Sequence, residues 1–133
     1  ISMNIDADYF FDRLFSEHPN SIFTQWGYIY KGEMLESSGG TKPAIAFYTK
    51  ALNKASDLEV AATAAYNLAN AFIPTSYKKS AKYIKKIIDA KPKFFIKNFK
   101  VSKEMMEIFA DRGDYKTAAS IANALSLSMT KEN

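Results

Sequence analysis

The chain has 133 residues, 47% of them apolar and 24% charged, which is typical of a globular domain with a core of its own. It contains no cysteine, which excludes disulfides and thiolate chemistry, and no apolar run approaches the ~20 residues of a membrane-spanning helix. The first residues lack the basic-then-apolar order of a signal peptide, so we expect a cytoplasmic protein.

The net charge of +4 is unevenly distributed along the chain. Residues 78–103 carry ten lysines and a single acidic residue, Asp89, whereas the segments before and after them each have a net negative charge. A block of this kind is either the solvated face of a helix or a site for an anionic partner, and the two alternatives predict different functions.

Apolar residues recur at helical spacing along the chain, and no segment alternates as a half-buried strand does, so the predicted fold class is all-α. Ser56 and Glu59 have the spacing of a capping box and should begin the fourth helix, which Pro74 should end. The seven predicted helices span about residues 6–17, 22–37, 41–55, 56–74, 76–92, 93–111 and 115–128.

Four columns of residues repeat with a period of 37. One column is small, and it consists of Ala44, Ala81 and Ala118. Agreement of four columns at one period predicts a helix-turn-helix unit used three times, in which alanine permits paired helices to approach closely. The three apolar columns are Leu35, Phe72 and Phe109; Phe47, Ile84 and Ile121; and Ala51, Ile88 and Leu125.

Several segments resemble the tetratricopeptide repeat. The run PAIAFYTKAL, residues 43–52, is similar to the second helix of that repeat, and AAYNLANAF, residues 64–72, is similar to its first helix. The GDY of residues 113–115 matches the turn between the family's helices, and Gly32 and Gly39 fall at its two glycine places. The resemblance covers about residues 25–128.

The resemblance implies one domain, a helical-repeat solenoid of about seven antiparallel helices. Two departures leave other helical-hairpin repeats open: the period is 37 residues rather than about 34, and the family's tryptophan place holds Tyr28, Ala65 and Ser102. In this organisation residues 1–20 form an N-terminal capping helix, and the repeats are 21–57, 58–94 and 95–130.

In this family the first helix of each repeat lines a concave groove that commonly binds a peptide or a helix of a partner. The resemblance therefore implies a non-catalytic adaptor or chaperone-like module. Side-chain amides can bond an extended peptide backbone, and lysines can receive a carboxylate. The expected lining residues are Trp26, Ile29, Glu33, Tyr66, Asn67, Asn70, Lys100, Lys103 and Glu107.

The lysine block has a second interpretation. On a helical wheel residues 76–89 are amphipathic, with the lysines opposite the apolar arc, which favours a solvated convex surface. The alternative is a nucleic-acid-binding helical repeat that uses Lys78–Lys103. The block has no arginine, and we expect its aromatic residues to be needed for the core, which disfavours nucleic acid as a partner.

We expect no enzyme activity, cofactor or metal. His18 is the one histidine, no cysteine can complete a zinc site, and the five glycines form no phosphate-binding loop. Few residues follow the last helix, which would leave the outer side of the last repeat uncovered. We therefore expect a homodimer or a partner contact through the C-terminal end, with a self-assembling structural subunit as an alternative function. The sequence does not identify the partner.

Overall fold

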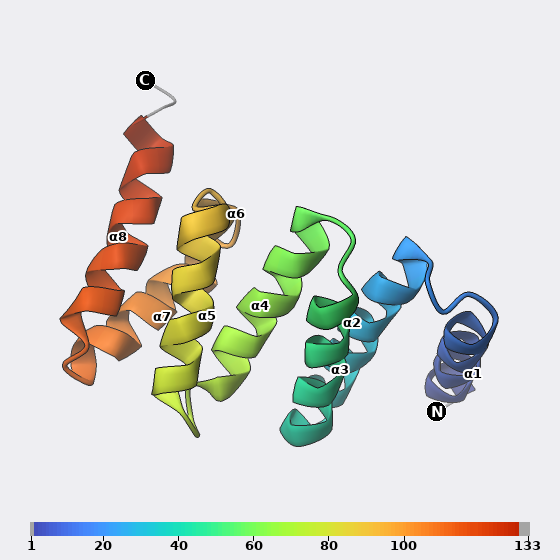
Figure 1. Cartoon of the computed structure of the whole chain (residues 1–133). Helices are drawn as coiled ribbons and strands as arrows, with labels where there is room; N and C mark the ends of the chain where they lie inside the picture. The colour runs from blue at the N-terminus through green and yellow to red at the C-terminus, as the bar shows by residue number, and fades with distance from the viewer. Residues whose placement is uncertain (1, 131–133) are drawn as a thin grey trace. The chain divides into compact units, whose positions relative to one another are not determined.

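The computed structural model describes the backbone of residues 2–130 and the side chains of residues 7–127. These residues form eight α-helices and no strand, so the all-α prediction is confirmed (Figure 1). No helix within this part of the chain has both the length and the apolar character needed to cross a membrane. The helices are α1 (Ser2–Glu17), α2 (Ile22–Ser37), α3 (Thr41–Lys54), α4 (Leu58–Phe72), α5 (Tyr77–Ala90), α6 (Phe94–Lys97), α7 (Phe99–Asp111) and α8 (Tyr115–Thr130).

The chain forms two compact units, and their boundary falls inside α4 and inside the second predicted repeat. Unit 1 ends at Ala64, and unit 2 begins at Ala65. The two units also differ in the sign of their net charge. Unit 1 has five basic and eight acidic residues, a net of −3, whereas unit 2 has thirteen basic and six acidic residues, a net of +7.

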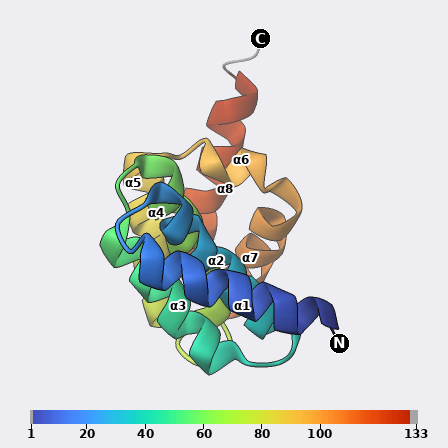
Figure 2. The ribbon, with the colours of Figure 1, turned by 90° about the vertical axis from the view of Figure 1, so that its right-hand side faces the viewer.

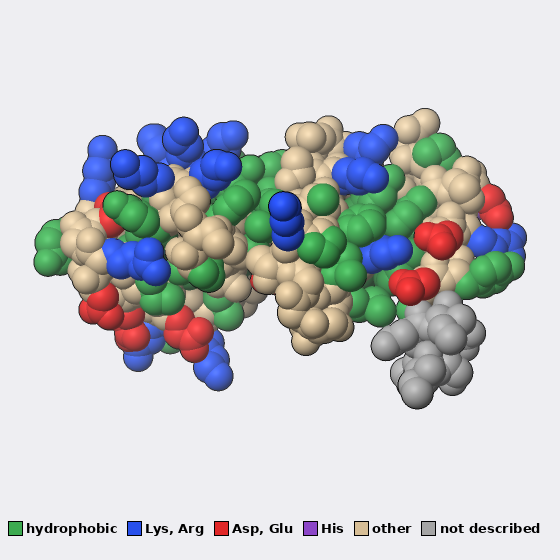
Figure 3. All heavy atoms as spheres, turned by 90° about the horizontal axis from the view of Figure 1, so that it is seen from below, with side chains coloured by type: hydrophobic (Ala, Val, Ile, Leu, Met, Phe, Trp, Pro, Cys, Tyr) green, Lys and Arg blue, Asp and Glu red, His purple; other side chains and the backbone are tan. Residues whose placement is uncertain are grey.

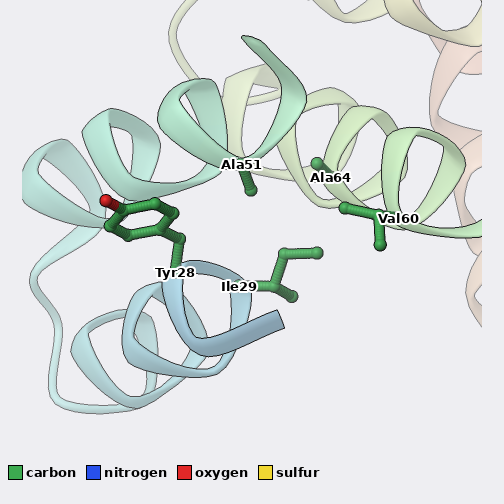
Figure 4. Packing of buried hydrophobic residues seen from close by; sticks show 5 residues of the cluster. All are labelled: Tyr28, Ile29, Ala51, Val60 and Ala64. Carbon is green, nitrogen blue, oxygen red and sulfur yellow. The ribbon is translucent and has the colours of Figure 1, made fainter. Parts of the chain in front are cut away.

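Unit 1 consists of α1, α2, α3 and the first half of α4. Helix α2 packs against both α1 and α3, and α1 lies against α2 in Figure 2. The core of this unit joins α2, α3 and α4 through side chains that point toward one another (Figure 4). Apart from a small exposed part of the Tyr28 ring, these side chains are fully buried: Tyr28, Ile29, Ala51, Val60 and Ala64.

Helices α2 and α3 approach closely at Gly32. A Cβ atom at this position would lie 2.4 Å from Cε1 of Tyr48, so only a glycine leaves room for the ring. The Tyr48 ring is fully buried, and its hydroxyl donates a hydrogen bond to the Glu36 carboxylate. The contact between the two helices therefore depends on the glycine that the sequence places there.

Unit 2 consists of the second half of α4 and of α5 to α8. Helix α8 packs against α5, α6 and α7. The Ser80 hydroxyl at the start of α5 donates to the carbonyl of Ala69 at 2.6 Å, which joins α5 to α4. Phe109 and Ile121 are fully buried, as expected for members of the repeating apolar columns.

Two helix ends separated by twice the period of 37 share one backbone geometry. Gly39 follows the end of α2 and Gly113 follows the end of α7, with φ angles of 88° and 85°. The amide after each glycine donates to the carbonyl of Leu35 at 2.7 Å and of Phe109 at 2.9 Å, which is the Schellman pattern. The end of α4 differs, since the carbonyl of Phe72 accepts the Ser76 amide, four residues later, at 2.7 Å.

The prediction of one helix over residues 93–111 is wrong. The structure has two helices there, separated at Asn98, whose φ of −118° and ψ of 51° are not helical. The Asn98 side-chain amide donates to the carbonyl of Phe94 at 3.0 Å, and the Ser102 hydroxyl donates to the carbonyl of Phe95 at 2.8 Å. These local bonds compete with the helical ladder, as asparagine and serine often do.

The predicted capping box at Ser56 and Glu59 is also wrong. Asp57 caps α4, since its carboxylate accepts the Val60 amide at 2.8 Å. The amide and hydroxyl of Ser56 instead donate to the side-chain oxygen of buried Gln25, at 2.9 and 3.2 Å. Ser56 therefore holds the α3–α4 loop on α2 rather than beginning a helix.

Candidate partner-binding site

An apolar groove of about 510 Å³ lies in unit 1 between α1 and α2. Its floor includes Gly27, where a Cβ atom would lie 3.0 Å from the Phe15 ring and 3.1 Å from Leu14. Glycine at this position therefore lets α1 approach α2 closely at the groove. The groove is lined by Phe10, Phe11, Leu14, Phe23, Trp26, Gly27 and Tyr30.

Large aromatic side chains stand open to solvent on this groove. Phe23 is 71% exposed, Phe10 is 65% exposed and Tyr30 is 52% exposed, while Trp26 is half-buried. Contiguous apolar patches of this kind are uncommon on monomeric proteins, and they often mark sites where another molecule binds.

The aromatic walls of the groove are fixed by contacts behind them. The rings of Trp26 and Tyr30 stack with centroids 6.1 Å apart, and the Phe15 ring stacks on Tyr28 at 4.4 Å. The fully buried Thr24 hydroxyl contacts the carbonyls of Leu14 and His18, which attaches the end of α1 to α2. A groove with fixed walls loses little conformational entropy when a ligand binds.

A second cleft, of about 340 Å³, continues from the groove along α1 and shares Phe10 and Leu14 with it. Its polar rim includes Arg13 and Glu17, which form an exposed ion pair at 2.8 Å. An apolar centre with a charged rim is the usual anatomy of a protein-protein interface.

Only part of the predicted lining in unit 1 is on the surface. Trp26 lines the groove, and Glu33 is exposed seven residues later, on the same face of α2. Ile29 is fully buried in the core that joins α2, α3 and α4, so it is removed from the binding surface as a correction. The accessible face of α2 therefore includes Trp26, Tyr30 and Glu33, and it does not include Ile29.

In unit 2, Tyr66 is buried and is likewise removed from the binding surface. The Ser102 hydroxyl donates to Phe95, so the Tyr66 hydroxyl is the donor to Ser102, at 2.7 Å. Burial raises the pKa of Tyr66, and the bond joins α4 to α7. Its role is structural.

The remaining predicted residues of unit 2 are on the surface or near it. Asn70 is exposed and Asn67 is half-buried on α4. Lys100, Lys103 and Glu107 are exposed on α7. They belong to a different unit from Trp26 and Glu33, and the predicted single lining is therefore divided between the two units.

All five lysines of α5 are exposed, and lysine and arginine side chains gather over this part of unit 2 in Figure 3. Phe94 and Phe95 are buried against Tyr66, and Tyr83 stacks on Phe72 at 6.1 Å, as expected. Tyr77 and Phe99 are exposed, so the expectation that the aromatic residues are needed for the core is only partly met.

The described part of the chain shows no cluster of three or more acidic or histidine side chains that could hold a metal ion. Burial, together with the hydrogen bond to Glu36, raises the pKa of Tyr48 far above its ordinary value. The predicted contact through the C-terminal end concerns the outer side of the last two predicted helices, about residues 93–111 and 115–128, and it stays a prediction.

The sequence interpretation missed Phe10, Phe23 and Tyr30 as binding residues. The sequence analysis does not single them out, although α2 has large apolar residues on more than one face. A helix that needs only one buried face has no use for so many large apolar residues, so their number indicates a second, exposed apolar face.

The chain matches no protein-family model, and comparison with curated proteins gives no relative. Its function is therefore inferred from its own residues.

Proposed function

We propose that the chain is a non-catalytic protein-interaction module of tetratricopeptide-like helical repeats, and that unit 1 binds an apolar-faced helix of a partner protein in the groove between α1 and α2. The observation that carries this proposal is the exposure of Phe10, Phe23 and Tyr30 around a groove with a glycine floor. An amphipathic helix that lays its apolar face into such a groove is a recurrent mode of recognition.

Two further features support a helix as the occupant. Phe23, Trp26 and Tyr30 follow the spacing of one helical face, so they offer a linear row of anchors. Aromatic residues in a partly desolvated row are the side chains that most often dominate binding energy at protein interfaces. The adaptor or chaperone-like role, and a cytoplasmic location, belong to this proposal.

The chain contains its own probe of the groove, since Trp26 is its single tryptophan. A library of displayed helical peptides is selected on the intact chain, and binding of each selected peptide is followed by the emission of Trp26. We expect a shift of the emission to shorter wavelength, because a bound helix removes water from the half-buried indole.

The control is an aromatic residue of equal exposure elsewhere. Phe23→Ala should weaken binding by at least about ten-fold, since truncating one anchor costs more than 1.4 kcal/mol. Tyr115→Ala, at the start of α8, removes a side chain that is also 71% exposed and should leave binding unchanged. Peptides that bind both variants equally and leave the emission of Trp26 unchanged would contradict the proposal.

A further inference from the structure

A further cleft, of about 370 Å³, lies in unit 2 between α5 and α8. Its apolar part is formed by Ala81, Ile84 and Ile88 on α5. Ile84 is almost fully buried, while Ala81 and Ile88 are partly exposed, so an aliphatic surface is open at the bottom of the cleft. These three residues belong to the repeating columns, and the unit 1 counterparts of Ala81 and Ile88, which are Ala44 and Ala51, are fully buried.

The rim of this cleft is basic. Lys82 and Lys85 come from α5, Lys116 comes from α8, and one carboxylate, that of Asp89, lies among them. Lys85 and Asp89 pair at 3.1 Å. Within the described part of the chain Lys82 and Lys116 have no ion-pair partner, so two cations flank the aliphatic surface from opposite helices.

The charge around the cleft has the same sign. Unit 2 has a net charge of +7, and the other lysines of α5, Lys78, Lys79 and Lys86, are exposed as well. A surface with this potential attracts acidic molecules and accelerates their encounter.

We propose that the α5–α8 cleft binds an acidic segment of a partner protein, with one large apolar side chain of that segment on Ala81 and Ile88 and its carboxylates on Lys82 and Lys116. This site lies in unit 2 and goes beyond the groove of the proposed function.

The chemistry of the cleft favours an acidic peptide over a nucleic acid. A phosphate backbone is bound by cations alone, and single-stranded bases need aromatic faces on which to stack. The cleft has no aromatic residue and no arginine, and its floor is aliphatic. An aliphatic floor between cations instead matches an apolar side chain flanked by carboxylates.

The test uses three labelled probes in fluorescence anisotropy at low salt: a random copolymer of glutamate and tyrosine, polyglutamate of equal length, and single-stranded oligothymidylate. We expect the copolymer to bind at least about ten-fold more tightly than polyglutamate, because partial burial of one aromatic ring is sufficient for that factor. Binding of both should weaken as salt is added.

Three variants locate the binding. Lys82→Glu with Lys116→Glu should weaken copolymer binding by at least about ten-fold, whereas Lys78→Glu with Lys86→Glu, which changes the net charge equally, should weaken it by no more than about two-fold. Ser120→Phe, on the α8 side of the cleft, fills it without changing charge. It should reduce the affinity for the copolymer to that for polyglutamate and leave the affinity for polyglutamate unchanged.

Three results would overturn the proposal. Equal affinity for the copolymer and polyglutamate would mean that the apolar floor is not used. Equal losses in the two double variants would mean that the charge acts without the cleft. Tighter binding of oligothymidylate than of the copolymer would replace the peptide by a nucleic acid. Circular dichroism of each variant checks that its helices are intact.

Discussion

Replacing Gly32 by alanine tests the close contact of α2 with α3. The added Cβ would lie 2.4 Å from Cε1 and 2.8 Å from Cδ1 of the Tyr48 ring. Carbon atoms in contact are normally about 3.5–4.0 Å apart, so the ring or the helices must separate by more than ~1 Å. The ring has nowhere to go, because Tyr48 is fully buried and its hydroxyl is held by Glu36.

The magnitude follows from two opposing terms. Overfilling a core of this kind costs about 1–3 kcal/mol, and the contact at Gly32 belongs at the upper end of that range. Alanine in place of glycine inside a helix contributes about 1 kcal/mol of stabilisation. We therefore expect Gly32→Ala to lower the free energy of unfolding by about 1–2 kcal/mol.

The measurement is urea unfolding, followed by circular dichroism and by the emission of Trp26, which lies on the same helix as Gly32. The control is Gly32→Ala in a Tyr48→Leu background, where the shorter side chain can move aside. In that background the substitution should be neutral or stabilising by about 1 kcal/mol, since only the helix propensity remains. An equal loss in both backgrounds, or no loss in the native one, would refute the role assigned to the ring contact.

Two further predictions concern pH and a helix end. Burial raises the pKa of Tyr48 in the folded state. The free energy of unfolding should therefore fall as the pH rises above the unfolded-state tyrosine pKa of about 10. Tyr48→Phe should make this fall shallower in unfolding curves measured across that range. An unchanged slope would contradict the coupling. Gly113→Ala should lower thermal stability by about 1 kcal/mol because φ is +85° there, and Gly113→Asn, which tolerates that φ, should cost less in the same calorimetric scan; equal losses would count against backbone strain as the cause.

The helices were predictable where periodicity and turn residues agree. Gly39 and Gly113 mark two helix ends in the sequence and have the positive φ that a left-handed cap requires. The interruption at Asn98 was not predictable, because the helical pattern continues through it. It is held by hydrogen bonds from Asn98 and Ser102 to nearby carbonyls, together with the long-range hydrogen bond of Tyr66. The helical spacing of apolar residues does not predict such bonds.

The candidate site was less predictable than the fold. Aligning repeats identified Trp26 and Glu33 as surface residues of α2, but it placed Ile29 on the same face, where the structure buries it. The error follows from the packing of α3 and α4 on α2, which covers Ile29 with Ala51, Val60 and Ala64. A spacing rule within one helix does not contain that information, and it also did not predict Phe23 and Tyr30 as surface residues.

Because the two units have opposite net charges, the ionic strength of the buffer acts on two kinds of encounter at once. Unit 1, at −3, attracts cationic molecules and unit 2, at +7, attracts anionic ones, over ~10 Å at 0.1 M salt and about three times as far at a tenth of that concentration. Dilute buffers therefore strengthen the binding of charged partners to either unit, and physiological salt weakens it. The isoelectric point of about 9.2 describes a uniformly basic molecule, which this chain is not.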